Sequence, residues 1–188
     1  MVWLDDRDGG GRSLRFDLYH LTLDNRGADM TGDGQADVLS GADMDDPGGV
    51  FLAGAAFVHR SEERSVNTGL WPNPVPLLPP IPETQARFGL KVAAGDVTGD
   101  GLADAIVAAP DASPGGSNSS GEVWVFPADG NGGFLPPWAP IRHPSLDPGA
   151  LMGTDIVVAD VTGDGKPDLV IGAPGGGGTG EVLIYPAP

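Results

Sequence analysis

Cysteine is absent from the 188 residues, which excludes disulfides and thiolate metal sites. No apolar run approaches the ~18 residues of a membrane-spanning helix, so we expect no membrane insertion. Basic residues are scarce: 10 Lys and Arg stand against 26 Asp and Glu and give a formal net charge of −16. Since nucleic acids are polyanions, this charge predicts that they are not partners. The segment Met1–Asp8 lacks a basic stretch followed by an apolar one, so we expect no export signal within this chain.

Glycine and proline are abundant by contrast, with 31 and 19 residues. Short runs of β-branched and other apolar residues alternate with clusters of Gly, Pro, Asn and Asp, and no segment has the pattern of a long helix. This alternation is typical of an all-β protein. A chain of this length can bury one core of moderate size.

One acidic segment of nine residues occurs three times. The copies are Asp29–Asp37, Asp96–Asp104 and Asp160–Asp168, and their starts lie 67 and 64 residues apart. Each copy has an oxygen-bearing side chain at positions 1, 3, 5 and 9 and Gly at position 6. Alternating oxygen ligands with a glycine at the sharp turn are typical of loops that bind a hard cation. The sequence therefore predicts calcium sites within a repeat architecture.

A plain Asp-Gly turn between two strands would explain a single copy equally well. Three copies with one oxygen spacing favour metal binding instead. The loops are not EF-hands, because the twelfth position, which holds Glu in that motif, is Ser40, Val107 or Ile171 here. Since three crowded carboxylates repel one another, we expect a bound cation to stabilise each hairpin.

The expected ligands are the carboxylates at positions 1, 5 and 9, the hydroxyl at position 3 and the backbone carbonyl at position 7. An all-oxygen set favours Ca²⁺ over a transition metal, and a flexible loop suits Ca²⁺ better than Mg²⁺. About three ions per chain would reduce the net charge to about −10. The predicted metal residues are Asp29, Thr31, Asp33, Gln35 and Asp37, then Asp96, Thr98, Asp100, Leu102 and Asp104, then Asp160, Thr162, Asp164, Lys166 and Asp168.

Apolar segments flank each loop and repeat with it. One strand precedes the loop, a strand that is apolar on both faces follows it, and a third strand comes after a link. A Pro-rich fourth segment belongs on a sheet edge, because proline donates no hydrogen bond to a ladder. Each repeat thus predicts a four-stranded antiparallel sheet, and such sheets stack as the blades of a β-propeller. The predicted strands are 37–42, 54–59 and the edge segment 67–80; 88–95, 104–110, 121–127 and the edge segment 131–140; and 152–159, 168–174 and 180–186.

Aligning the repeats predicts four units. These are a partial blade at 1–20 with a third and fourth strand, a degenerate repeat at 21–85, a second repeat at 86–149 and a third at 150–188 that lacks its outer strand. Two strands in the partial blade, four in each of the next two repeats and three in the last make 13 strands, or about three blades, too few for a closed ring of about 4–8 blades. Either the chain is a piece of a longer propeller or several copies complete a ring, and we favour the piece.

The repeats resemble the FG-GAP/VCBS repeats of integrin-alpha-type β-propellers, over roughly residues 21 to 186. The resemblance is carried by Phe88-Gly89, the second and third acidic loops, the closing segments Ala108–Pro110 and Gly172–Pro174, and the strands that begin Gly-Glu-Val. Four features depart from the family pattern: Met152-Gly153 replaces Phe-Gly, Leu21-Thr22 replaces it in the first repeat, Asp43 rather than Pro follows Ala42, and Thr occupies position 3 of each loop in place of Asp or Asn.

This resemblance implies a seven-bladed propeller with Ca²⁺ bound between the first and second strands of a blade. Family members are mostly extracellular or cell-surface proteins used for adhesion or ligand binding. The resemblance therefore predicts a secreted or cell-surface location and a protein or glycan ligand. A carbohydrate-binding propeller and the accessory propeller of a secreted hydrolase are alternatives. Trp71 and Trp138 are the residues that would stack on a sugar, although packing between blades is the commoner role.

Catalytic motifs are not found in the sequence. There is no Gly-x-Ser-x-Gly motif, and the run Gly175–Gly178 lacks the Lys that completes a phosphate-binding loop. His20, His59 and His143 share no ligand spacing, so we expect them at the surface or at strand edges. We therefore predict that this segment is not itself an enzyme.

Overall fold

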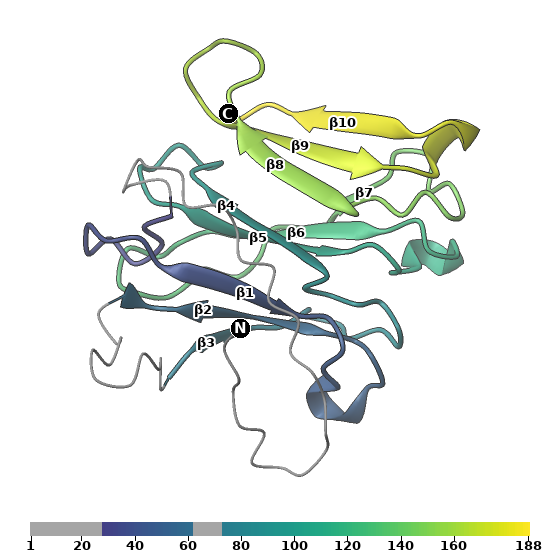
Figure 1. Cartoon of the computed structure of the whole chain (residues 1–188), viewed down its shortest axis with the longest axis horizontal. Coiled ribbons are helices and arrows are strands. Elements are labelled where there is room, and N and C mark those ends of the chain that lie inside the picture. Colours follow the sequence, from purple (N-terminus) through teal and green to yellow (C-terminus); the bar gives the residue numbers. More distant parts are fainter. Residues whose placement is uncertain (1–27, 62–72) are drawn as a thin grey trace, which may run out of the picture.

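The computed structural model describes residues 28–61 and 73–188, which form three antiparallel β-sheets stacked face to face (Figure 1). The first sheet holds β1 (Val38–Ala42), β2 (Ala55–His59) and β3 (Val75–Leu77). The second holds β4 (Lys91–Gly95), β5 (Asp104–Ala109), β6 (Glu122–Phe126) and β7 (Ile141–Arg142). The third holds β8 (Asp155–Ala159), β9 (Asp168–Ala173) and β10 (Glu181–Tyr185).

Helical structure in the described residues is limited to short 3-10 turns. These are η1 (Pro47–Gly49), η3 (Pro114–Gly116) and η4 (Gly176–Gly178), one in the link before β2, β6 and β10. Within this described part, no helix has the length and apolar character needed to span a bilayer. The predicted partial blade at 1–20, His20 and Trp71 lie outside the described residues.

The middle sheet confirms the predicted four-stranded antiparallel blade. Its strands pair in the order β4-β5-β6-β7, so each strand lies beside its neighbour in sequence. The first strand leads into the acidic loop and the second strand follows it. The two strands pair directly beside the loop, with Gly95 opposite Asp104. The all-β, blade-like architecture predicted from the repeat is therefore present.

The fourth strand of the middle sheet begins later than the sequence predicts. The predicted edge segment 131–140 runs beside β6, because Leu135 N donates to Pro127 O at 2.8 Å and Trp138 N donates to Val125 O at 3.0 Å. Prolines at 136, 137 and 140 interrupt the ladder, so regular pairing starts only at Ile141. In the first sheet, β3 lies within the predicted segment 67–80.

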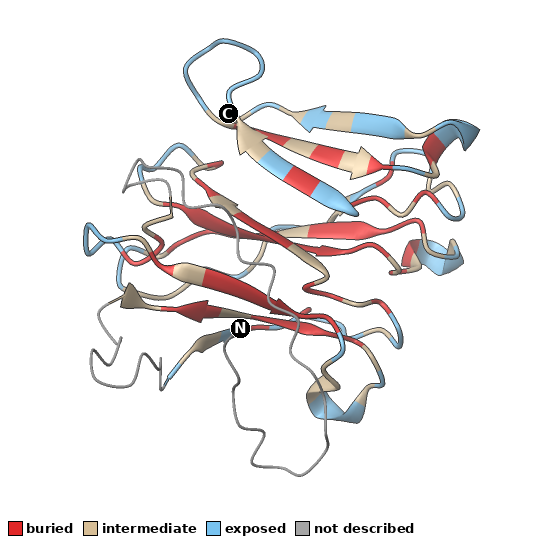
Figure 2. Ribbon diagram, in the orientation of Figure 1, coloured by how far each residue is buried: buried red, intermediate tan, exposed pale blue. Residues whose placement is uncertain are grey.

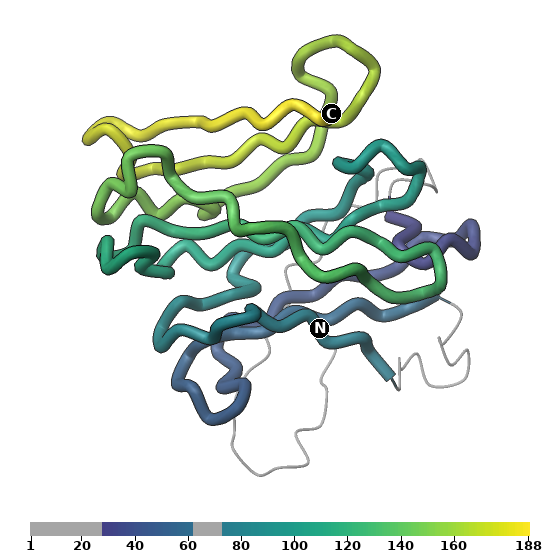
Figure 3. Tube along the Cα trace, turned by 180° about the vertical axis from the view of Figure 1, so that it is seen from behind, coloured from purple at the N-terminus to yellow at the C-terminus, as the bar shows by residue number. Residues whose placement is uncertain are grey.

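The core occupies the two interfaces between the three sheets. Alternate residues of β5 face opposite neighbours: Ala105 and Val107 pack with the first sheet, whereas Ile106 and Ala108 pack with the third. Every residue of β5 is buried, which explains why its sequence is apolar throughout. Figure 2 shows this burial at the centre of the stack and exposure along β10, and Figure 3 shows the same three layers from behind.

Each blade docks on a glycine of the preceding blade. A Cβ atom at Gly54 would lie 2.0 Å from Phe88 O, and one at Gly121 would lie 2.2 Å from Met152 O. Phe88 and Met152 are both fully buried, so the Met-Gly of the third repeat occupies the place of Phe-Gly in the second. The Phe88 ring also meets the edge of Phe126, with ring centroids 6.1 Å apart.

We expect Gly121→Ala to destabilise the fold by about 2–4 kcal/mol, because a methyl group would displace the Met152 backbone and Gly121 has a positive φ of 88°. The matched control is Gly116→Ala, where φ is 80° but no atom lies within 4 Å of the added carbon. Urea unfolding of both variants separates the two effects. Equal losses for the two variants would contradict the docking role of Gly121.

Candidate metal-binding loops

The three acidic loops lie at one end of the stacked sheets. The second loop joins β4 to β5, the third joins β8 to β9, and the first leads into β1. In Figure 1 they project at the left, whereas the links that contain η1, η3 and η4 lie at the right. The loops and these links therefore form two separate surfaces of the molecule.

The first-position carboxylate organises each loop by accepting backbone N–H groups from positions 4 and 6. Asp96 Oδ1 accepts from Gly99 N at 2.6 Å, and Oδ2 accepts from Gly101 N at 2.8 Å. Asp29 makes the same pair of bonds at 2.7 and 2.9 Å, and Asp160 makes them at 2.6 and 2.9 Å. The degenerate first repeat thus builds its loop in the same way as the other two.

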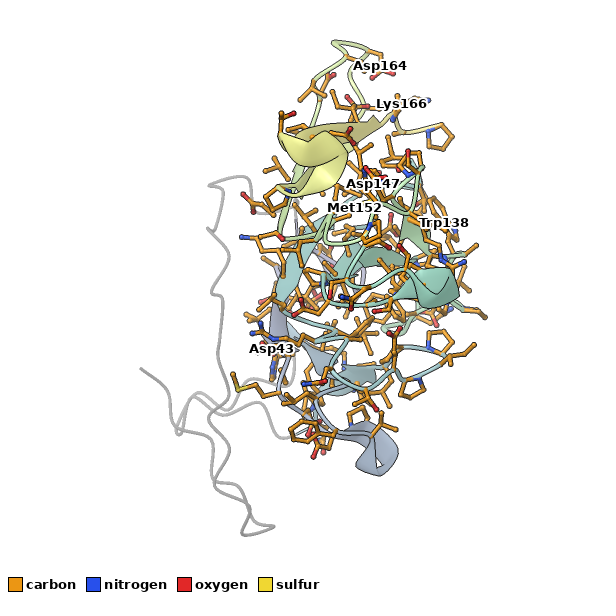
Figure 4. The ribbon with its side chains drawn as sticks, turned by 90° about the vertical axis from the view of Figure 1, so that its right-hand side faces the viewer. Asp43, Trp138, Asp147, Met152, Asp164 and Lys166 are labelled. Atoms are coloured by element: carbon orange, nitrogen blue, oxygen red, sulfur yellow. The ribbon has the colours of Figure 1, made fainter. Side chains whose placement is uncertain are left out.

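The fifth-position carboxylate holds the backbone of position 7. Asp33, Asp100 and Asp164 each accept a bond from the N–H two residues later, at 2.7, 2.9 and 2.9 Å. Asp33 also accepts from Ser61 Oγ at 2.8 Å. These carboxylates lie in exposed parts of the loops, and Figure 4 shows Asp164 at the tip of the third one.

The ninth-position carboxylate is buried and connects the loop to the end of the third strand. Asp104 Oδ2 accepts from Val97 N and Thr98 N, both at 3.0 Å, and Oδ1 accepts from Ala128 N at 3.1 Å. The first loop repeats this pattern, with Ser61 N at 2.9 Å from Asp37 Oδ1, and the third repeats it, with Ala187 N at 3.3 Å from Asp168 Oδ1. This aspartate therefore serves as a structural anchor as well as a candidate ligand.

Glycines at both positions 4 and 6 have positive φ in every loop. The values are 81° and 92° for Gly99 and Gly101, and the other two loops differ from these by only a few degrees. The loop pattern predicted a required glycine only at position 6. Position 4 was also constant in the three copies, so the repeat alignment contained the signal that a second left-handed residue is required.

The pKa values of the three ninth-position carboxylates shift in different directions. Burial raises the pKa of Asp37 and of Asp104, although backbone hydrogen bonds act in the opposite direction. At Asp168 burial also acts to raise the pKa, but bonds from the backbone of Val161, Thr162 and Ala187 outweigh it and the pKa is lowered. In the first two loops a nearby cation would therefore offset the cost of burying a carboxylate charge.

The predicted ligands share each loop but do not converge on one point. In residues 28–61 and 73–188, no three His, Cys, Asp or Glu side chains are arranged to hold one metal ion. The donor chemistry does fit Ca²⁺, because each loop offers only oxygens. Thr31, at position 3, supports the fit: its residue is 8% exposed, it lies beside Asp37, and its Oγ1 makes no hydrogen bond of normal geometry with the described residues. A bound cation would give this buried hydroxyl a partner.

Two of the histidines expected at the surface or at strand edges lie at strand ends, but both are buried. His59 is 7% exposed, and its Nε2 lies 2.9 Å from Ser40 Oγ. His143 is 2% exposed, and its Nε2 lies 2.8 Å from Glu181 Oε2, so this pair connects the middle and third sheets. Their partners are 19 and 38 residues away in sequence, which is why residue spacing did not reveal them.

The tryptophan in the second edge segment is accessible, as the glycan interpretation requires. Trp138 is 43% exposed, and Figure 4 shows it on the side of the molecule away from Asp43. Trp124, by contrast, is partly buried against the core between the first and second sheets. Exposure alone fits a stacking surface but does not identify a sugar site.

A family model described as FG-GAP repeat matches residues 88–126 and 152–185. The two matched segments begin at Phe88 and Met152, the residues that dock on the preceding blade, and each contains one acidic loop. The match therefore covers the same elements of the second and third sheets.

Several curated proteins are similar to parts of this chain. Integrin alpha-PS5 of Drosophila melanogaster is 38% identical over 99 residues, which cover 52% of this chain and 10% of that protein. Phosphatidylinositol-glycan-specific phospholipase D of Rattus norvegicus is 31% identical over 167 residues, covering 80% of this chain and 18% of that protein. Integrin alpha-7 of Rattus norvegicus is 36% identical over 101 residues, covering 52% and 8%. The chain thus spans less than a fifth of each of these relatives.

Replacing the anchor carboxylate should cost more than replacing an exposed one in the same loop. Asp104→Asn exchanges one acceptor oxygen for an amide, so at least one of three backbone N–H groups loses its partner, at a cost of about 1–3 kcal/mol. Asp100→Asn is the control, because Asn keeps an acceptor for Leu102 N. Urea unfolding in a chelating buffer measures both, and a loss at Asp100 as large as that at Asp104 would contradict the anchor role.

The buried histidine of β2 should make stability fall on mild acidification. Burial lowers the pKa of His59 below its usual value near 6.5, so the unfolded chain takes up a proton before the folded one does. The neutral side chain's contribution is fully present above about pH 6.5 and is lost as the pH falls towards the lowered value. Urea unfolding at pH 7.5 and 5.5 should therefore show a smaller loss for His59→Gln than for the unaltered chain. Identical losses would argue against this burial effect.

Proposed function

We propose that this chain, which contains FG-GAP repeats, is a segment of an extracellular, calcium-binding β-propeller that serves adhesion or ligand recognition and has no catalytic activity of its own. The observation that carries the proposal is the threefold repetition of one loop framework, with the same backbone bonds to positions 1, 5 and 9. Such repetition is expected when all three loops have to bind the same kind of ligand. A turn that only joins two strands would not need three carboxylates in nine residues.

The calcium ligands in this proposal are the five oxygen donors of each loop. They are the side chains at positions 1, 3, 5 and 9 and the backbone carbonyl at position 7. Each first- and fifth-position carboxylate already orders backbone N–H groups, so the loop is partly organised before an ion arrives. In the described structure Oδ2 of Asp100 and of Asp164 accepts no hydrogen bond, which leaves these oxygens available. About three ions per chain would lower the mutual repulsion of nine loop carboxylates.

The recognition surface is proposed at the end opposite the acidic loops. Apolar side chains are exposed there on the links: Met44 is 43% exposed, Phe51 is 56% exposed and Ile81 is 82% exposed. The side chain of Arg87 connects links of two blades, with NH2 2.5 Å from Asp43 Oδ2 and NH1 3.6 Å from Asp111 Oδ2. A mixture of exposed apolar residues and charges on rigid links suits a protein ligand.

Two alternative functions retain some support. A glycan ligand is favoured by the exposed ring of Trp138. An accessory role beside a hydrolase is favoured by the similarity to phosphatidylinositol-glycan-specific phospholipase D, although the chain covers only 18% of that protein. A glycan array with the calcium-loaded chain and its Trp138→Ala variant distinguishes a glycan ligand from a protein ligand.

The partner that completes the propeller is proposed to bind the outer face of the third sheet. Val157, Val182 and Ile184 on this face are 49%, 69% and 52% exposed. In the repeat alignment they correspond to Ala93, Val123 and Val125, which pack under the third sheet. The exposed face therefore repeats the face that already receives a blade.

A docking hollow is present at the same place. Its volume is about 370 Å³, and Gly172, Gly180 and Val182 are among its lining residues. Gly180 corresponds to Gly121, the glycine that receives Met152 in the interface below. We propose that a further blade from the rest of a longer chain occupies this position, and a second copy of the chain is the alternative. A secreted or cell-surface location follows from the family resemblance.

Removing calcium should lower the melting temperature by several degrees, on the order of 5 °C, because ions that bind only the folded loops stabilise the folded state. Thermal melts in calcium, in chelator and in chelator followed by excess calcium measure the effect. Asp100→Asn, which keeps an acceptor for Leu102 N, should reduce the calcium-dependent shift while leaving the melt in chelator nearly unchanged. Identical melts in calcium and chelator for the unaltered chain would overturn the proposed role of the metal.

A further inference from the structure

We infer that the first two acidic loops bind calcium as a coupled pair, whereas the third binds independently. The inference rests on the proposed calcium binding and concerns how its sites influence one another. Its basis is a hydrogen bond between loops of neighbouring blades, in which Ala103 N donates to Asp29 O at 2.9 Å. Asp29 is position 1 of the first loop, and Ala103 is position 8 of the second.

The two loops also touch through a side chain. Leu102, at position 7 of the second loop, lies against the first loop, with its Cδ2 atom 3.4 Å from where a Cβ atom of Gly32 would be. The backbone bond and this contact involve neighbouring residues of the second loop, Leu102 and Ala103, and two residues of the first, Asp29 and Gly32. A change in the order of one loop therefore acts directly on the backbone of the other.

The hydrogen bond fixes the direction of a proposed metal ligand. The peptide bond between Leu102 and Ala103 is planar and trans, so its N–H and C=O groups point in opposite directions. When Asp29 O accepts from this N–H, the Leu102 carbonyl is oriented away from the first loop. That carbonyl is the position-7 donor in the proposed ligand set, so ordering the first loop prepares the second.

The first loop also carries a buried hydroxyl close to the Asp37 carboxylate, where its hydrogen bond acts to lower the pKa of that carboxylate. This residue, Thr31, lies two residues after Asp29 and is 8% exposed. A cation in this loop would engage this hydroxyl and fix the segment that carries the Asp29 carbonyl. The ion and the bond between the loops would thus be linked through three consecutive residues.

The third loop lacks the group that makes this connection. Its position 8 is Pro167, which has no backbone N–H, so it cannot donate to the second loop as Ala103 donates to the first. The backbone frame of the three loops is otherwise the same, including the positive φ values of the glycines at positions 4 and 6. The chain therefore contains a natural comparison, with one loop pair joined by this bond and one pair without it.

Coupling of this kind is reciprocal at equilibrium. An ion in the first loop reduces the ordering that the second loop must undergo when it binds its own ion, and the second loop affects the first by the same factor. We expect calcium affinity of the second loop to fall about tenfold when the first loop cannot bind. The third loop should keep its affinity.

The test follows each loop separately in the full-length chain by NMR, using the backbone amide signals of Gly34, Gly101 and Gly165 during calcium titration. Asp33→Ala removes the position-5 ligand of the first loop, and Asp164→Ala removes its counterpart in the third. The result expected is that Asp33→Ala weakens binding at Gly101 about tenfold and leaves Gly165 unchanged, whereas Asp164→Ala leaves both Gly34 and Gly101 unchanged. Equal effects of the two variants on Gly101, or no effect of either, would overturn the coupling.

Ala103→Pro tests the hydrogen bond itself, because it gives the second loop the residue found in the third. In this background Asp33→Ala should no longer alter binding at Gly101, so the two changes form a double-mutant cycle. A tenfold effect that persists without the N–H group would show that the bond does not carry the coupling. If Ala103→Pro prevents folding, the comparison of Asp33→Ala with Asp164→Ala still decides whether coupling exists. No calcium-dependent shift at any of the three glycines would instead overturn the proposed function.

Discussion

The geometry of a blade depends on the hydrogen bonds that the ninth-position aspartate of its acidic loop accepts. The buried carboxylate of this aspartate accepts two N–H groups from the start of its own loop and one from the residue two positions beyond the third strand, as Asp104 does with Val97, Thr98 and Ala128. One side chain thereby joins the first, second and third strands at the loop end. The same carboxylate is costly to bury, because burial raises the pKa of Asp37 and Asp104. The same carboxylate therefore holds the strands together and favours a positive charge nearby.

The blades are joined by close backbone contacts at the other end of the sheets. Phe88 and Met152 enter beside Gly54 and Gly121, where a side chain at either glycine would overlap a carbonyl oxygen. Between these points the cores are built from small and β-branched residues that alternate between the two faces of each strand. Such close packing leaves little room for one blade to move against the next. The links at the proposed recognition end are therefore held by a rigid scaffold.

Much of this arrangement was predictable because the determinants are local and repeated. The loops, the strands that flank them and the four-stranded blade followed from nine-residue copies and the apolar segments beside them. Non-local determinants were not predictable. The burial of His59 and His143 depends on Ser40 and Glu181 in other strands, and the bond between Ala103 and Asp29 depends on how two blades stack. The late start of β7 reflects prolines whose effect on pairing depends on the neighbouring strand.

Calcium binding by the loops would give one explanation for the repeated loop framework, for the buried carboxylates and for the buried hydroxyl of Thr31 beside Asp37. The most direct test is native mass spectrometry of the folded chain, recorded in calcium and again after exhaustive chelation. The account predicts a mass increase of about three calcium ions per chain that disappears with chelator. A folded chain that retains no calcium at millimolar concentration would contradict it, and the loops would then be Asp-Gly turns whose carboxylates serve the backbone alone.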